Sequence, residues 1–136
     1  MNRIGIDLGG TKIEAVAMDP QGAVIERLRV PAPQAYRDTL EAIGGLVNAI
    51  EREYGDGSRV GIGHPGSISP ATGLMRNANS TWLNGHPFAR DIEAALGRPV
   101  RLANDADCFT LSEAVDGAGQ GAGIVFGIIL GTGVGG

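Results

Sequence analysis

The run DLGGTK, between two apolar stretches near the start of the chain, combines the groups needed to hold a phosphate. Gly9 and Gly10 leave backbone N–H groups uncovered, so a tight turn can aim several of them at one anion. Thr11 adds a hydroxyl donor and Lys12 adds a positive charge. Asp7 would repel a bare phosphate, but a carboxylate can hold Mg²⁺, usually through water. The pattern therefore favours a site for a nucleotide bound together with its metal.

A plain hairpin turn is the alternative explanation of Gly9 and Gly10, because such turns need positive φ angles. That explanation covers the two glycines alone and leaves out the carboxylate, the hydroxyl and the lysine around them. The Walker phosphate loop is excluded, because it needs the spacing G-x-x-x-x-G-K-[ST] and a following helix. Here the turn joins two expected strands.

A second polar cluster lies in the run NANSTWLNG after Arg76. Asparagine offers a donor and an acceptor together, which suits paired hydroxyl groups on a sugar ring. Asparagine and serine also satisfy loop backbone for local reasons, and we assign Asn77 and Asn84 to that local role. Trp82 is expected to be an anchor in the core or in a lid, since the run holds no other aromatic residue.

Asn104 and Asp105 close an expected strand and begin an expected helix. Aspartate is a favoured N-cap, so a structural role alone would account for Asp105. A carboxylate also suits phosphoryl transfer, in which the base orients the attacking hydroxyl and accepts its proton late. The two roles are compatible, and the residue types alone leave both open. His64 and His86 lack partners at ligand spacing, so neither is expected to be catalytic.

The chain ends in the run GTGVGG, which follows an apolar stretch. On paper this matches the dinucleotide fingerprint G-x-G-x-x-G, but that fingerprint needs a following helix and an acidic residue about twenty positions later. Neither is present in the sequence. The spacing alone therefore leaves the role of Gly131, Thr132 and Gly133 open.

The elements that must position these residues follow from hydrophobic periodicity and turn signals. The expected strands are residues 4–8, 13–18 and 23–30, which form an antiparallel meander, and then 59–63, 100–103 and 124–130. The expected helices start at Tyr36, at Phe88 and after Asn104, and residues 64–87 are expected to be irregular. Alternating helices and strands after a meander predict an α/β fold with helices covering a mixed sheet.

Length, charge and cysteine content exclude several classes of protein. The 136 residues suit one compact domain, and 11 basic against 15 acidic residues offer no basic surface for nucleic acid or an anionic membrane. One cysteine rules out an internal disulfide and favours a reducing compartment. The start of the chain shows neither a leader nor a stretch of membrane-spanning length. We expect a soluble, cytoplasmic protein without nucleic-acid or membrane partners.

Taken together, the motifs resemble the superfamily of sugar kinases, heat-shock ATPases and actin, and in particular its ROK branch (repressors, open reading frames and kinases). DLGGTK is similar to the first phosphate loop of that family, GIGHPGSI to its strand and turn below the sugar, and NANSTWLNGHPF to its sugar-contacting loop. RLANDAD resembles the segment of the catalytic aspartate, and GTGVGG resembles the second phosphate loop. The amino-acid sequences of these last motifs are most similar to those of fructokinase (mannofructokinase) members.

This resemblance implies a ribonuclease H-like (actin-like ATPase) fold and the transfer of the γ-phosphoryl group of ATP, with Mg²⁺, to a hexose, with fructose as the first candidate. It implies nucleotide-phosphate contacts at Gly9, Gly10, Thr11, Lys12, Gly131, Thr132 and Gly133. It implies sugar contacts at Gly66, Ser67, Asn79, Asn104 and Asp105, with Asp105 as the catalytic base and Asp7 holding Mg²⁺ through water.

The resemblance also predicts how the chain is organised. Residues 1–121 would form an N-terminal actin-like ATPase and sugar-binding domain, and residues 122–136 would be the first strand and phosphate loop of a second domain. In the family, that second domain supplies a structural zinc site and the rest of the cleft, and the complete proteins are expected to be homodimers. We therefore expect the 136 residues alone to phosphorylate no hexose.

Two other functions remain open. ROK repressors, which are sugar-responsive transcriptional regulators, share this core. Their helix-turn-helix would precede the first strand, where the sequence has only three residues, and this disfavours the repressor. A non-catalytic sugar-binding module is the other alternative, and the role of Asp105 would distinguish it from a kinase.

Overall fold

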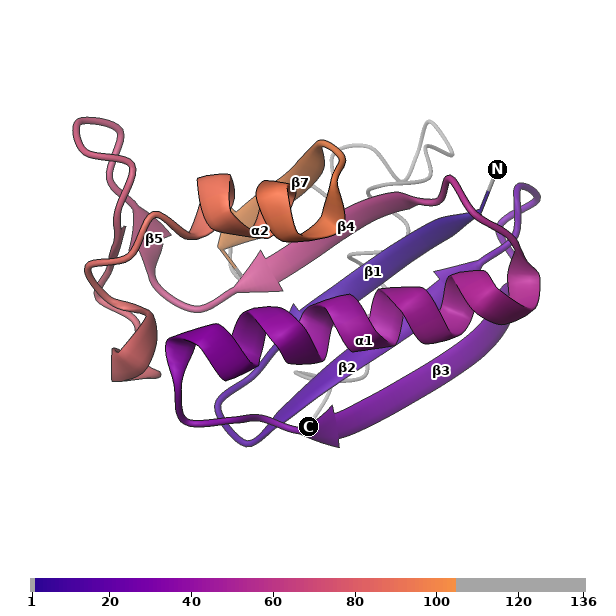
Figure 1. Ribbon diagram of the computed structural model, residues 1–136, viewed down its shortest axis with the longest axis horizontal. Helices are drawn as coiled ribbons and strands as arrows, with labels where there is room; N and C mark the ends of the chain where they lie inside the picture. Colours follow the sequence, from indigo (N-terminus) through magenta and orange to yellow (C-terminus); the bar gives the residue numbers. More distant parts are fainter. Residues whose placement is uncertain (1, 105–136) are drawn as a thin grey trace.

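The computed structural model describes residues 2–104, and Met1 and residues 105–136 lie outside this described part. The strands are β1 (Arg3–Leu8), β2 (Lys12–Met18), β3 (Val24–Pro31), β4 (Arg59–His64), β5 (Ser67–Ile68), β6 (Met75–Arg76) and β7 (Val100–Asn104), and the helices are α1 (Tyr36–Tyr54), the 3₁₀ helix η1 (Thr81–Leu83) and α2 (Phe88–Leu96). Five strands form one sheet in the order β3-β2-β1-β4-β7 (Figure 1).

The first three strands form the expected antiparallel meander. β1 pairs with β2 over all six of its residues, and β2 pairs with β3. In the β2–β3 turn, one carboxylate oxygen of Asp19 accepts hydrogen bonds from the backbone N–H groups of Gln21 (3.0 Å) and Ala23 (2.9 Å). β3 extends through Pro31, one residue past the expected end. Proline is tolerated there because β3 is the edge strand.

The other half of the sheet is parallel. β4 pairs with β1 and β7 pairs with β4, so these three strands point the same way. Together with the meander they make a mixed sheet, and the prediction of an α/β fold is confirmed. Such parallel strands place the loops that follow them along one edge of the sheet.

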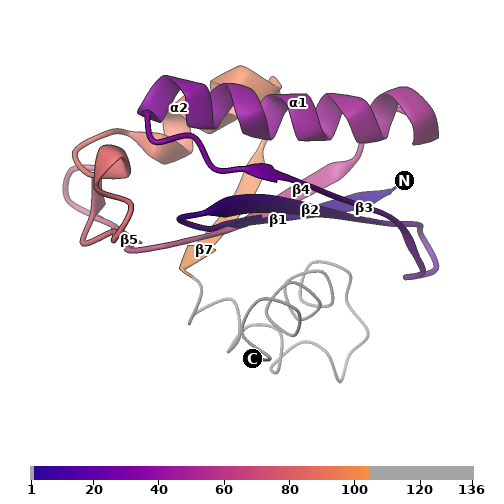
Figure 2. The same ribbon diagram turned by 90° about the horizontal axis from the view of Figure 1, so that it is seen from below.

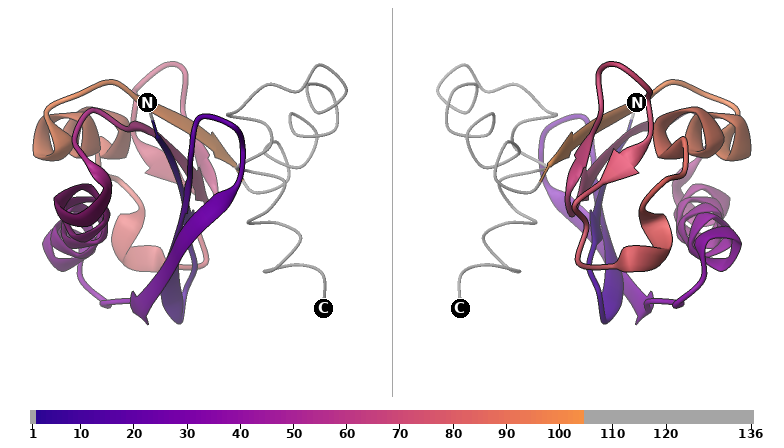
Figure 3. Two further views of the ribbon diagram at one scale, coloured as in Figure 1. Left: turned by 90° about the vertical axis from the view of Figure 1, so that its right-hand side faces the viewer. Right: turned by 90° about the vertical axis from the view of Figure 1, so that its left-hand side faces the viewer.

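Helices α1 and α2 cover the same face of the sheet, as Figures 2 and 3 show. The buried residues of α1 recur at intervals of three and four, and they pack with Ile4, Ile6 and Leu8 of β1 in the hydrophobic core. The helix runs to Tyr54, beyond the expected face that ended at Ile50. α2 ends at Leu96, and the C-cap residue Gly97 that follows has a φ of 66°, in the left-handed region.

A partly buried ion pair joins the far end of α1 to the chain after α2. The guanidinium of Arg98 donates to both carboxylate oxygens of Glu51, at 2.7 and 2.8 Å. The Ser58 backbone N–H donates to the same carboxylate at 2.9 Å. The hydrogen bond from Arg98 lowers the pKa of Glu51 to about 2. This network fixes the amino end of the parallel strands.

The stretch 64–87, expected to be irregular, contains three short elements. β5 and β6 form a two-stranded sheet, and η1 follows them. Each element has only two or three residues, which is too short to produce a periodic pattern. Figure 1 places this segment at the end of the molecule toward which β1 and β4 point.

Several predictions fall outside the described residues. They are the helix after Asn104, the strand 124–130 and the domain boundary between residues 121 and 122. Within residues 2–104, neither helix has the combination of length and apolar character that crossing a membrane would require.

Candidate functional site

The carboxyl ends of β1, β4 and β7 bring three of the predicted motifs together. In the sheet register, Asp7 of β1 is level with Gly63 of β4, and Gly63 is level with Ala103 of β7. The glycine turn follows the first strand, the turn with Gly66 follows the second, and Asn104 ends the third. The phosphate motif and the sugar motifs therefore share one edge of the sheet.

Gly9 shapes the turn between β1 and β2. Its backbone N–H donates to the carbonyl oxygen of Lys12 at 3.1 Å. A Cβ atom at this position would lie 2.7 Å from that same oxygen, so only glycine fits. The glycine pattern predicted that the Gly9 amide helps to hold phosphate, but the turn itself uses this amide.

The amides of Gly10 and Thr11 are available for a ligand. Within residues 2–104 neither N–H donates a hydrogen bond, and both residues are exposed. The Thr11 carbonyl oxygen accepts from the Ala32 N–H at 2.9 Å, which holds the turn against the end of β3. The tip of the hairpin is thus a fixed loop with two uncovered N–H donors, which is the arrangement that binds anions.

Asp7 and Lys12 flank this turn. Asp7 lies directly opposite Glu14 in the β1–β2 register, so the two carboxylates share the sheet face away from the helices. Glu14 is buried and lies 3.7 Å from the Arg27 guanidinium and 3.6 Å from that of Arg29. These two cations offset the repulsion between the neighbouring carboxylates. Lys12 is the exposed first residue of β2.

Gly66 lies where the predicted sugar motifs meet. Its φ is 65°, and a Cβ atom there would collide with the Arg76 carbonyl oxygen and lie 2.7 Å from the Ala78 nitrogen. Only glycine allows the β4–β5 turn to approach the chain that leads to Asn79. Next to it, the Ser67 hydroxyl accepts a hydrogen bond from the Arg76 guanidinium at 3.3 Å.

Asn104 is tied to the same turn. Its side-chain amide donates to the carbonyl oxygen of Gly66, which links the end of β7 to the loop after β4. Asn104 and Gly66 were predicted separately as sugar contacts, and the structure brings them into direct contact. The predicted base Asp105 directly follows Asn104 in the chain and lies outside the described residues.

Asn79 is exposed and is presented by a fixed backbone. The Asn84 side chain accepts from the Ala78 N–H at 2.9 Å and donates to the Ala78 carbonyl at 3.1 Å. Asn77 has a φ of 60°, the left-handed region that asparagine tolerates. Both asparagines therefore have the local roles expected of them, and they leave Asn79 as the outward-facing amide of the loop.

Ser80 is a residue whose position the sequence analysis did not anticipate. It is 5% exposed, and its hydroxyl oxygen lies 3.5 Å from the place where a Cβ atom of Gly10 would be. This proximity places the predicted sugar loop (residues 77–88) beside the predicted phosphate turn (residues 9–12). The sequence alone gave no signal for it, because Asn79, Ser80 and Thr81 are three adjacent polar residues and nothing marks which of them turns inward.

The two histidines have structural surroundings. His64 is buried, and its ring meets Phe88 edge to face. His86 stacks on Tyr36 with a centroid separation of 3.8 Å. The Tyr36 hydroxyl donates to Asp91 at 2.7 Å, and burial, together with this bond, raises the pKa of Tyr36. The same bond lowers the pKa of Asp91.

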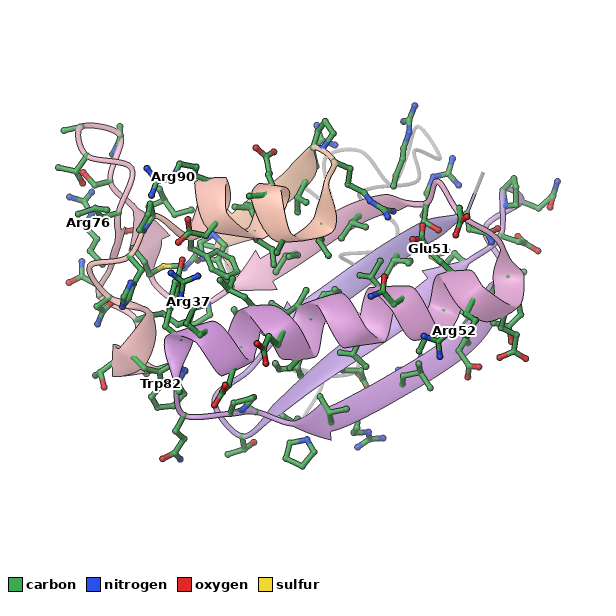
Figure 4. The ribbon with its side chains drawn as sticks, in the orientation of Figure 1. Arg37, Glu51, Arg52, Arg76, Trp82 and Arg90 are labelled. Atoms are coloured by element: carbon green, nitrogen blue, oxygen red, sulfur yellow. The ribbon has the colours of Figure 1, made fainter. Side chains whose placement is uncertain are left out.

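The stacked pair of His86 and Tyr36 anchors the end of the sugar loop to the first turn of α1. Figure 4 shows Arg76 and Trp82 at this end of the molecule and Glu51 toward the other end of α1. Trp82 packs against the hydrophobic core and is partly buried, as an anchor residue would be.

The predicted second phosphate loop, Gly131, Thr132 and Gly133, lies outside the described residues, as does Asp105. Among residues 2–104, no three His, Cys, Asp or Glu side chains gather into a metal centre. A single carboxylate such as Asp7 fits a cation that keeps most of its water ligands, as Mg²⁺ does.

Comparison with known proteins identifies a family and several relatives. The sequence model of the ROK family matches residues 3–136. The chain is 42% identical over 133 residues to an N-acetyl-D-glucosamine kinase of Haemophilus influenzae (strain 86-028NP). The aligned region covers 97% of this chain and 44% of the relative. The chain thus spans less than half of the length of this curated relative.

Solved structures agree on the fold. A ROK family glucokinase from Streptomyces griseus, in complex with glucose and AMPPNP, has a TM-score of 0.72 and 31% identity over 89% of this chain and 38% of the other. A ROK family transcriptional regulator, a homologue of the E. coli MLC protein, has a TM-score of 0.66 over 84% of this chain and 30% of the other. At 19% identity the regulator shares the fold alone.

Proposed function

Because the chain belongs to the ROK family, we propose that it is the lobe of an ATP-dependent hexose kinase that binds the nucleotide phosphates and the sugar. The single observation that carries this proposal is the pair of uncovered amides at Gly10 and Thr11, beside the loops of Gly66 and Asn79. A phosphate donor and a polyol acceptor would meet at this edge of the sheet. The ATP analogue and the glucose bound by the Streptomyces relative support both ligand classes.

In the proposed reaction, Asp105 is the base. It accepts the proton of a sugar hydroxyl as the oxygen attacks the terminal phosphoryl group, and the phosphoryl group leaves its bridging oxygen on the nucleoside diphosphate. The transition state is loose, so the carboxylate has mainly to orient the hydroxyl. Asn79 and Ser67 would hold neighbouring hydroxyls, and Asn104 would support Gly66 beside them. The amides of Gly10 and Thr11 would bind the phosphates.

Mg²⁺ would be held near Asp7 through water, and when bound it would offset the negative charge of the phosphates. Asp7 fits this role because it precedes the glycine turn at the end of β1, and Gly63, its neighbour in the register, carries no side chain. Lys12, exposed beside the same turn, would add a positive charge.

For the acceptor we propose fructose first, since the motifs after residue 63 resemble those of fructokinases. The relative from Haemophilus makes N-acetylglucosamine the second candidate, because it is named a kinase of that sugar. The residues that distinguish hexoses in this family come partly from a second domain, so the acceptor has to be found by assay.

The test uses the longest natural protein that carries this lobe, with Asp105→Asn as the diagnostic variant. We expect ATP-dependent formation of a hexose phosphate by the parent, and a loss of kcat of about 100-fold or more in the variant, with sugar affinity nearly unchanged. The 136-residue chain alone is expected to bind but not to transfer, since exclusion of water requires the closed cleft. A parent that binds hexose but forms no sugar phosphate would support the regulator or the binding module instead.

A further inference from the structure

Two buried serine residues, Ser58 and Ser80, have hydroxyls that make no hydrogen bond within residues 2–104, and they lie at opposite ends of the sheet. Ser58 precedes β4 at its amino end, and its oxygen is fully enclosed without a partner. Ser80 lies beside the phosphate turn at the carboxyl end of β1. A serine that is buried as a residue and has no hydrogen-bond partner for its hydroxyl is uncommon, so each needs a reason.

Ser80 differs from Ser58 because a ligand can reach its hydroxyl. Ser58 Oγ is the only unpartnered side-chain oxygen in the described residues that is completely closed off from solvent, so Ser80 Oγ retains access. The oxygen lies 3.5 Å from the position of a Gly10 Cβ, on a turn that is itself exposed. A side chain on Gly10 would cover this oxygen. The absence of one leaves it open toward the turn.

The backbone of Ser80 is held in place from both sides. Its carbonyl oxygen accepts from the Leu83 N–H at 3.0 Å, and the preceding chain is fixed by the two hydrogen bonds between Asn84 and Ala78. The hydroxyl is therefore presented to a ligand at little cost in conformational entropy.

We propose that Ser80 is a phosphate-binding residue, and that its O–H donates to an oxygen of the terminal phosphoryl group of the donor. It would act with the amide donors of Gly10 and Thr11, giving three hydrogen-bond donors that lack partners in the described structure. The terminal group is the one assigned because Ser80 belongs to the same loop as Asn79, the predicted sugar contact, and the transferred group must lie between the donor and the acceptor. This assignment rests on the proposed function.

Calorimetric titration of the 136-residue chain tests the proposal, with magnesium ATP, magnesium tripolyphosphate and adenosine as probes. Ser80→Ala should weaken the binding of both triphosphates about tenfold, since a hydrogen bond to a charged group is lost. Ser80→Cys keeps the volume with a much weaker donor and should show the same loss. The matched control Ser58→Ala should bind like the wild type, and the affinity for adenosine should not differ among the four proteins.

Wild-type affinity, within a factor of two, in both folded Ser80 variants would overturn the role of Ser80 and leave the proposed function standing. A wild-type chain that binds neither triphosphate would overturn both proposals.

Discussion

The side-chain amide of Asn104 donates a hydrogen bond to the carbonyl oxygen of Gly66, and this one contact ties together the ends of two neighbouring parallel strands. The Asn104 amide thus has a structural partner in addition to any sugar. The geometry of the proposed acceptor site depends on this link, because Gly66 in turn packs against the backbone of the Asn79 loop.

Removing the link should cost stability. Asn104→Ala leaves the Gly66 carbonyl without its donor, and we expect a loss of about 1–3 kcal/mol in the free energy of unfolding. Urea denaturation followed by circular dichroism measures it. Asn79→Ala is the control, because Asn79 is exposed and should change stability by no more than about 0.5 kcal/mol. Equal stability of the two variants would show that the Asn104 contact contributes nothing.

Gly66→Ala should be among the most damaging substitutions in the lobe. The new methyl group would meet the backbone of Arg76 and Ala78 at a φ of 65°, so both steric and conformational costs apply. We expect a loss of more than about 2 kcal/mol in unfolding free energy. Gly73→Ala is matched in φ, at 74°, but has open space around it, and should lose only about 1 kcal/mol. Similar losses in both would mean that the close approach at Gly66 is not what requires glycine.

Gly44 and Gly45 should respond in the opposite direction. Both lie inside α1, with no positive φ, and a Cβ atom at either position would meet nothing within 4 Å. Alanine should therefore stabilise the chain by about 0.5–1 kcal/mol at each site, because glycine has the poorer helix propensity. Thermal unfolding of the two single variants measures this. A lower melting temperature in either would contradict the open surroundings seen here.

The ion pair between Glu51 and Arg98 predicts an acid-sensitive fold. Arg98 holds the pKa of Glu51 at about 2 in the folded chain, against an ordinary value of 4.5. A carboxylate with a depressed folded-state pKa adds stability above its unfolded pKa, and that contribution is lost as the pH falls from about 4.5 to about 2.

The contribution should be on the order of 2 kcal/mol, allowing for partial solvent screening of Arg98. Glu51→Gln should lose it at neutral pH, and the stability of this variant should then fall less between pH 5 and pH 2. Glu41→Gln, which changes an exposed carboxylate on the same helix, should keep the wild-type profile. The free energies of unfolding of the three proteins, measured between pH 5 and pH 2, test this prediction. The same dependence on pH in the wild type and in Glu51→Gln would contradict the contribution assigned to Glu51.

Long elements could be predicted from the sequence because their patterns repeat. The spacing of Tyr36, Leu40, Ile43, Val47 and Ile50 identifies α1, and these residues are indeed buried. The meander followed from apolar runs separated by turn residues. β5, β6 and η1 could not be predicted in this way, since two or three residues cannot show a period and their pairing is decided by tertiary contacts.

The residue types of the candidate site could be predicted from the sequence, but not which backbone amides and side chains remain available to a ligand. The sequence marked Gly9 and Gly10 alike, yet the hydrogen bond across the turn uses the Gly9 amide and leaves that of Gly10 uncovered. It could not separate Asn79 from Ser80 either. Which of two adjacent polar side chains turns inward depends on the backbone path that Asn84 fixes.

The central claim is that one edge of this sheet holds a metal-bound triphosphate at the glycine turn and a hexose at the neighbouring loops. Amide NMR of the labelled 136-residue chain, titrated separately with magnesium ATP and with fructose or N-acetylglucosamine, tests it most directly. We predict that ATP shifts the signals of Gly10 and Thr11, and that one of the sugars shifts those of Gly66, Ser67 and Asn79. Unchanged signals at the glycine turn at saturating ATP, or ATP-induced shifts confined to the opposite end of the sheet, would contradict the account.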